Sequence, residues 1–136
     1  MDTPQDLAWL LGTEVHVHYN IPKRLWSILW LRGPKRGTVI GYATTIVLEK
    51  VTFIVSAPGR ARAQRTGQRS VHAHVVGTVV AINTEENLQQ LTRVSYNPAR
   101  DRPATFHTPD GKPVHYAERA VFARPSPEAE HGYAWI

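Results

Sequence analysis

Polar and apolar residues alternate with a period of two along much of the chain, which is typical of β-strands with one face in a core. The alternation is strict over residues 14–19, where Val, Val and Tyr occupy one face and Glu, His and His the other. Apolar or β-branched segments continue this pattern at 25–31, 38–42, 45–48, 51–55, 71–82 and 93–97. Shorter strands follow between the later prolines. We therefore predict a mainly β fold, a β-rich α+β arrangement of antiparallel sheets.

Two leucine-bearing segments have the signals of short helices. In residues 3–11, Thr3 suits the N-cap, Pro4 suits the first helical position, and Gly12 ends the segment. Leu7, Leu10 and Leu11 share one face of this segment. Residues 84–91 have a similar capped start and place Leu88 and Leu91 on one face. The sequence therefore predicts a helix in each half of the chain.

The second half of the chain echoes the order of motifs in the first. The block Gly37-x-x-Ile-x-Tyr-Ala has the same internal spacing as the block that begins at Gly111, and Trp26 matches Phe106. We predict a single domain, 1–136, built from two diverged helix-plus-β-meander repeats. These are residues 3–56 and 84–136, joined by the basic segment 58–70 and the strand 71–82. The alternative is chance similarity, because strand periodicity repeats trivially.

The composition suits a globular domain, with 20% charged and 42% hydrophobic residues in a chain of 136. The absence of cysteine excludes disulfide and thiolate chemistry. The apolar stretch 7–11 is too short for a membrane segment and follows two aspartates. We expect no membrane association and a location in the cytoplasm.

The positive charge is concentrated in the first part of the chain. Residues 14–81 hold ten Lys and Arg against two Glu, a net +8, and the remaining residues carry −3, which together make the +5 of the whole chain. This distribution favours an anionic ligand or surface. The alternative is a solvated face that only confers solubility.

Two His-x-His pairs, His16/His18 and His72/His74, stand on predicted strands. Residues i and i+2 of a strand share a face, so four imidazoles would converge if the two strands were neighbours, and imidazole suits zinc, copper or nickel. No carboxylate or cysteine is spaced to complete such a site. We therefore interpret the pairs as outward polar positions and expect no metal and no cofactor.

A basic segment adjoins the second histidine pair. As a helix, residues 60–69 place three arginines on one side, although a mobile loop fits nearly as well. Arginine binds phosphate bidentately, tyrosine stacks on a base, and an asparagine amide reads a base edge. For Asn97 the alternative is a turn in which its side chain caps the backbone. The predicted ligand-binding residues are Arg24, Arg62, Arg65, Arg69, His72, His74, Tyr96 and Asn97.

No catalytic signature occurs in the chain. Gly-x-Ser-x-Gly, His-Glu-x-x-His and a glycine-rich phosphate loop are all absent. We therefore expect a binding protein and not an enzyme.

Three motifs carry a family resemblance: Val15-His-Val-His-Tyr-Asn20, Val71-His-Ala-His-Val-Val-Gly77 and Val94-Ser-Tyr-Asn-Pro98. Together they resemble a family of small bacteriophage proteins over roughly residues 15–122. The resemblance implies a role in phage counter-defence. The anti-Thoeris proteins that sequester nucleotide immune signals are the first comparison to make.

The leading hypothesis is a non-enzymatic phage protein that sequesters a phosphate-bearing nucleotide signal, of the cyclic ADP-ribose type or a cyclic oligonucleotide. One alternative is a basic nucleic-acid-binding protein, and another is an inhibitor that binds a host enzyme. Because a small sponge often closes its pocket between protomers, we also expect a homo-oligomer.

Overall fold

A computed structural model describes residues 6–67, 71–123 and 132–136 of the chain. Most of these residues belong to a ten-stranded antiparallel sheet, and the mainly β prediction is confirmed. The first five strands are β1 (Glu14–Asn20), β2 (Leu25–Trp30), β3 (Val39–Ala43), β4 (Thr45–Val55) and β5 (Ala73–Ile82). The others are β6 (Arg93–Tyr96), β7 (Phe106–His107), β8 (Pro113–Val114), β9 (Tyr116–Ala123) and β10 (Gly132–Trp135).

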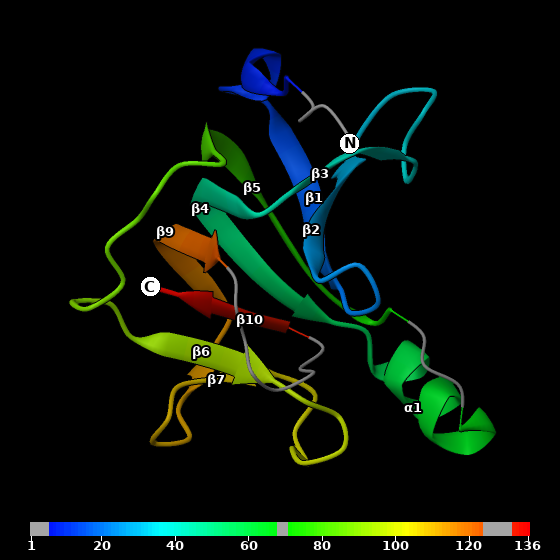
Figure 1. Cartoon of the computed structure of the whole chain (residues 1–136). Helices are drawn as coiled ribbons and strands as arrows, with labels where there is room; N and C mark the ends of the chain where they lie inside the picture. The colour runs from blue at the N-terminus through cyan, green and yellow to red at the C-terminus, as the bar shows by residue number, and fades with distance from the viewer. Residues whose placement is uncertain (1–5, 68–70, 124–131) are drawn as a thin grey trace.

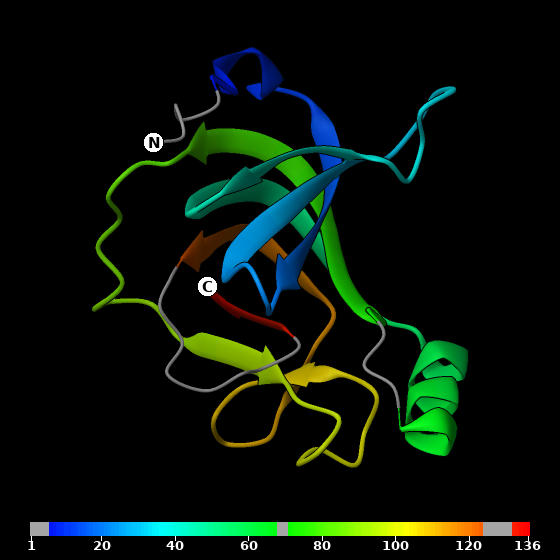
Figure 2. The ribbon, with the colours of Figure 1, turned by 45° about the vertical axis from the view of Figure 1, so that its right-hand side comes forward.

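The strands lie in the order β3-β2-β1-β5-β4-β9-β10-β6-β7-β8. Figures 1 and 2 show this sheet curving strongly, so that strands from its two halves face each other across a common interior. The inward positions of β1, Val15, Val17 and Tyr19, are all buried, as the alternation predicts. The core therefore lies on the concave face of one sheet that folds back on itself.

Aromatic rings join the two halves of the sheet in this core. The Trp26 ring on β2 lies 5.2 Å from the Phe122 ring on β9 and 5.0 Å from the Tyr133 ring on β10. The Phe53 ring on β4 lies 5.1 Å from the Phe106 ring on β7. Trp26 and Phe106, which the sequence comparison paired, are thus both core residues.

The α-helix α1 (Ala57–Thr66) connects β4 to β5 and projects from the sheet (Figures 1 and 2). It begins earlier than predicted, because Pro58 occupies an early helical position and the Ser56 hydroxyl caps the Gly59 N–H. It ends at Gly67, which adopts a left-handed φ of 70°. None of its residues is buried, so its contacts with the domain come from its first turn.

The predicted helix at 84–91 is wrong, since these residues form turns and irregular structure. The Thr84 hydroxyl donates to the Glu86 carboxylate and the Asn87 side chain accepts from the Gln89 N–H, so both potential caps bond locally. Leu88 and Leu91 instead pack on the outer face of the sheet, against a small cluster with Val47 and Val121.

The other predicted helix is described only from residue 6, and its helical part is the short 3-10 turn η1 (Ala8–Leu10). Leu7 and Leu10 are buried as predicted, whereas Leu11 is 52% exposed. Gly12 follows with a left-handed φ of 84°. The segment 3–5 with its predicted cap lies outside the described residues.

The strand order reads β3-β2-β1-β5-β4 on one side of the central β4–β9 pair and β8-β7-β6-β10-β9 on the other. Gly37 and Gly111, which the sequence comparison equated, both have a left-handed φ, of 82° and 89°. Residues 84–91 of the proposed second repeat form no helix. In its half of the sheet, β10 occupies the place that β5, which lies outside the proposed first repeat, occupies in the other half. The repeat with boundaries 3–56 and 84–136 stays a prediction.

Candidate functional site

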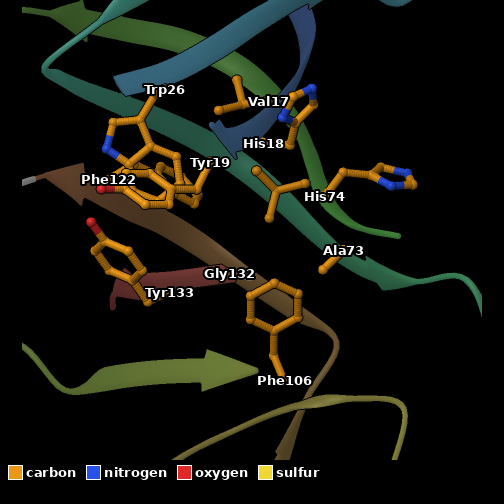
Figure 3. Close-up of a pocket in the computed structure, with 11 residues that line it drawn as sticks. Val17, His18, Tyr19, Trp26, Ala73, His74, Phe106, Phe122, Gly132 and Tyr133 are labelled. Carbon is orange, nitrogen blue, oxygen red and sulfur yellow. The ribbon is translucent and has the colours of Figure 1, made fainter. Parts of the chain in front are cut away.

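Two of the predicted site residues meet beneath the loop that follows β6. The His72 Nε2 and the Tyr96 hydroxyl are 2.9 Å apart and hydrogen bonded, and these residues are 2% and 0% exposed. The expectation that both histidines of this pair point outward is wrong for His72, which lies just before β5 and is buried against Tyr96. His74, on β5, is partly exposed and points away from the core rings (Figure 3). Because the rings of His72 and Tyr96 are both buried, we assign them a structural role in supporting the loop. That either ring contacts a ligand directly stays a prediction.

Arg60 of α1 extends this network to the loop itself. Its guanidinium lies 5.7 Å from the Tyr96 ring centre and donates a hydrogen bond to the Asp101 carbonyl. Gly59 packs so closely that a Cβ there would lie 2.9 Å from the His72 Cβ. The first turn of α1, the end of β6 and the loop at 97–105 therefore form one connected unit.

Asn97 shapes the start of this loop. Its side-chain oxygen accepts a hydrogen bond from the Ala99 N–H at 2.9 Å, and its own N–H donates to the Asp101 carboxylate at 2.8 Å. This is the capping turn that the sequence analysis kept as the alternative to base recognition. The Asn97 amide therefore organises the loop.

Asp101 is the centre of the loop, with a side chain only 8% exposed. Its carboxylate accepts a hydrogen bond from the Arg100 Nε at 3.1 Å and lies 3.0 Å from the His107 Nε2. Burial by itself raises the pKa of Asp101. The hydrogen bonds from Arg100, His107 and the Asn97 N–H outweigh burial and lower that pKa below its ordinary value.

His107 on β7 lies between two acceptors. Its Nδ1 is 3.0 Å from the Thr108 carbonyl, which can only accept, and its Nε2 faces the Asp101 carboxylate. Both ring nitrogens therefore donate, which is the arrangement of an imidazolium. The bond to Thr108, followed by the bond to Asp101, raises the pKa of His107 against the opposing effect of burial.

Replacing Asp101 by Asn is expected to lower the pKa of His107 toward its ordinary value and to destabilise the domain by about 1.5 kcal/mol near pH 5.5. The depressed Asp101 pKa contributes stability that is lost as pH falls through the folded pKa, below 3.8. The raised His107 pKa contributes stability that is lost as pH rises through the folded pKa, above 6.5. The difference in unfolding free energy between the wild type and Asp101→Asn should therefore shrink at both low and high pH.

NMR titration of the histidines and urea denaturation across this pH range provide the measurement. Glu85→Gln is the control, because it removes the charge of an exposed carboxylate outside the loop at 97–105 and the β7–β8 hairpin. An unchanged His107 titration in Asp101→Asn would contradict the pairing.

The loop at 97–105 and the β7–β8 hairpin line an open cleft with a volume of about 560 Å³. In Figure 1 these segments are the yellow and orange loops at the bottom. Arg102 is exposed in the cleft wall, and its side chain pairs with no residue in the described ranges. The cleft is lined by Arg100, Asp101, Arg102, Pro103, Thr105, His107, Gly111, Pro113 and His115.

The negative charge of Asp101 is compensated by Arg100 and His107, so with Arg102 the cleft carries a net positive charge. The ligand-binding residues predicted from the sequence do not include Arg100, Arg102, His107 or His115. One signal was available, since Arg-Asp-Arg at 100–102 is a dense charge cluster in a loop bounded by Pro98 and Pro103. The proximity of His107 depends on strands of only two residues, which no periodicity reveals.

The predicted arginines lie outside the lining of this cleft. Arg24 ends the β1–β2 turn with a left-handed φ of 55°, and Arg62 and Arg65 are exposed on α1. Arg69 lies outside the described residues. The structure therefore connects His72, Tyr96 and Asn97 with one another and does not join Arg24, Arg62 or Arg65 to them.

His74 meets the other histidine pair on the outer face of the sheet. The His16 and His74 ring centres are 4.1 Å apart, and those of His16 and His18 are 6.1 Å apart. Within the described residues, no group of three or more His, Cys, Asp or Glu side chains is arranged to hold a metal ion. The histidines gather, but their geometry is not that of a metal centre.

The gap in the interior of the fold, shown in Figure 3, is too small for a ligand of nucleotide size. That gap is lined by core residues that include Trp26, Phe106, Phe122 and Tyr133, and its volume of about 10 Å³ suits a single water molecule. The cleft is therefore the better candidate for a ligand site.

These features define a mainly β protein with one folded antiparallel sheet and a cationic cleft between two loops. The chain belongs to the bacteriophage family described as Mycobacterium phage L5 gene 82 protein, which it matches over residues 10–129. It is similar to the "Gene 82 protein" of Mycobacterium phage L5, with 24% identity over 96 residues that cover 71% of this chain and 75% of that protein. No solved structure matches the chain.

The family match contains the span over which the sequence resembled phage proteins, so that part of the resemblance is confirmed. A relation to signal-sequestering proteins stays a proposal. Among the described residues, no helix has the length and apolar character needed to cross a membrane.

Proposed function

We propose that this phage protein binds a phosphate-bearing nucleotide in the cationic cleft. The observation that carries the proposal is the pair of arginines, Arg100 and Arg102, in the wall of a cleft of about 560 Å³. Guanidinium groups bind phosphate through parallel hydrogen bonds. The bonds of Asp101 to Arg100 and His107 hold this wall in place before a ligand arrives, which lowers the entropic cost of binding.

The biological role that we propose is counter-defence, in which the phage protein sequesters a host nucleotide signal without altering it. Signals of the cyclic ADP-ribose type and cyclic oligonucleotides carry the phosphates that this cleft would recognise. Because the cleft is open, full enclosure of a nucleotide would need a second surface. A homo-oligomer that covers the cleft with a second protomer would supply it.

Calorimetry with a panel of cyclic ADP-ribose variants and cyclic oligonucleotides tests the proposal. Replacing Arg102 by Ala is expected to weaken binding at least about tenfold, since loss of a charge-assisted hydrogen bond costs roughly 1.5–3 kcal/mol. Arg24→Ala is the control, because Arg24 is exposed and lies outside the cleft lining. Absence of binding across the panel would refute the proposal.

The fate of the ligand separates sequestration from catalysis. After heat denaturation of the complex, intact nucleotide should be recovered and detected by mass spectrometry. Recovery of a cleaved product would instead assign an enzymatic role to the cleft. Native mass spectrometry of the same complex reports whether one or more protomers hold each ligand.

A further inference from the structure

The outer face of β1, β5, β4 and β9 carries side-chain rings that the cleft does not use. We name the ring face as His16, His18, His74 and Tyr116. The strand register aligns one residue from each of the four strands in a row across the sheet. His16 lies opposite Val76, Val76 opposite Thr52, and Thr52 opposite Tyr116. At about 4.8 Å per strand, this row extends about 14 Å across the sheet.

The three histidine rings lie together, and Tyr116 lies at the other end of the row. His16 lies 4.1 Å from His74 and 6.1 Å from His18 between ring centres, and all three residues are partly exposed. Tyr116 is 51% exposed. Figure 3 shows the rings of His18 and His74 on the side of the strands opposite to Phe106 and Tyr133. They are therefore not part of the aromatic core.

The three imidazoles are neutral at pH 7. Burial, and then repulsion from His74 and His18 when these are protonated, lower the pKa of His16 to about 4. Burial is also the main cause of the lowered pKa values of His18 and His74. Uncharged rings do not attract phosphate, but they stack on flat ligands. The ring face therefore differs in its chemistry from the cationic cleft.

Cationic groups lie on α1, which is the connection between two of these strands. The helix carries Arg60, Arg62 and Arg65 and no acidic residue. The side chains of Arg62 and Arg65 are exposed and pair with no residue in the part of the chain that the structure describes. A ligand on the ring face thus has positive charge available near the ends of β4 and β5, which is complementary to a polyanion.

We infer that the ring face binds single-stranded nucleic acid, with bases stacked on its rings and the backbone directed toward Arg62 and Arg65. Stacking needs unpaired bases, and every base offers a π-face, so binding tolerates sequence variation. The row has rings at its two ends, so one base would stack on the histidines and another on Tyr116, about 14 Å away across the sheet. This surface is separate from the nucleotide cleft and does not depend on the function proposed for it.

Fluorescence anisotropy with labelled oligothymidylate and oligouridylate of about 12 nucleotides tests the inference. Replacing Tyr116 by Leu is expected to weaken binding about tenfold. Tyr116→Phe keeps the ring, loses only the hydrogen bond from the hydroxyl to the exposed Glu118 carboxylate, and should bind like the wild type. Trp9→Leu is the matched control, because Trp9 is another exposed ring, 58% accessible, that is not on this face. Equal weakening by Trp9→Leu would overturn the assignment of the site.

Salt dependence tests the backbone contacts. The double variant Arg62→Gln/Arg65→Gln should reduce the slope of log K against log salt by about 1.4, since each phosphate contact to a single strand contributes about 0.7. The inference is overturned if the wild type binds neither oligonucleotide at about 50 mM salt, or binds duplex of the same sequence equally well.

One further variant distinguishes the ring face from the cleft. Arg102→Ala should leave oligonucleotide binding unchanged while it weakens nucleotide binding. If Arg102→Ala abolishes oligonucleotide binding and Tyr116→Leu does not, the strand occupies the cleft and the inference about the ring face is wrong. Failure of oligonucleotide binding alone leaves the nucleotide proposal intact.

Discussion

Replacing Trp26 by Ala is expected to destabilise the domain by about 3–5 kcal/mol, because it removes a large buried ring and leaves a cavity. Trp26 is 2% exposed and contacts Tyr19, Phe122 and Tyr133, with ring centres at 4.9, 5.2 and 5.0 Å. These rings come from both halves of the sheet. The variant therefore removes the contact that holds the folded sheet together across its interior.

A loss of this size is a large share of the roughly 5–15 kcal/mol that stabilises a typical domain. Guanidinium denaturation monitored by circular dichroism should show the loss of unfolding free energy, and thermal denaturation should show a fall in Tm on the order of 10–20 °C. Trp9→Ala is the control for tryptophan loss, because Trp9 is 58% exposed, and its effect should stay below about 1 kcal/mol.

A second variant, Trp26→Phe, separates packing from hydrogen bonding. The Trp26 indole N–H is buried and has no hydrogen-bond partner among the described residues. Phe therefore removes no hydrogen bond and keeps most of the ring, so we expect a cost of about 1–2 kcal/mol. If Trp26→Ala costs no more than Trp9→Ala, Trp26 does not close the core.

The strands near the start of the chain were predictable because one of their faces is buried. In β1 the alternation of Val15, Val17 and Tyr19 with polar residues is the direct consequence of a two-sided strand. The strands at 45–48 and 51–55 were predicted as separate, and they form one strand, β4. Lys50 adopts a left-handed φ of 52° at an irregularity in the pairing, which explains why the pattern changes there.

The turn at 83–92 shows where local signals fail. Thr84 and Asn87 are residues that cap helices and also bond to nearby groups in turns, so their presence does not decide between the two. Tertiary packing of Leu88 and Leu91 on the outer face of the sheet decided it. Sequence spacing of leucines could not reveal that the surface they cover belongs to β4 and β9.

The candidate site was only partly predictable for a related reason. His72, Tyr96 and Asn97 were selected by residue type, and the structure places all three in the unit that supports the cleft. The cleft wall itself depends on contacts between a loop and strands of two residues. Arg102 and His107 line the same cleft because the sheet brings their segments together.

Acid is expected to destabilise the domain through His16 by up to about 3 kcal/mol between pH 6.5 and 4. The folded pKa of His16 is about 4, against 6.5 for the free side chain, so the unfolded chain takes up a proton first as the pH falls. Stability from this residue is therefore complete above pH 6.5 and is lost progressively below it. The low pKa arises from burial and then from the charges of His74 and His18, which would repel a protonated His16.

Urea denaturation of the wild type and of His16→Gln at several pH values measures the effect. Because other groups also titrate, only the difference in unfolding free energy between the two proteins isolates the contribution of His16. The variant should lose less stability than the wild type between pH 6.5 and 4, and His115→Gln, at an exposed position, should follow the wild type. NMR titration reports the His16 pKa directly. Titration of His16 near 6.5, with equal slopes for both proteins, would mean that its ring is fully solvated and that the three imidazoles do not pack together. Because the ring face needs neutral imidazoles, the same titration also sets the pH range in which it can stack on bases.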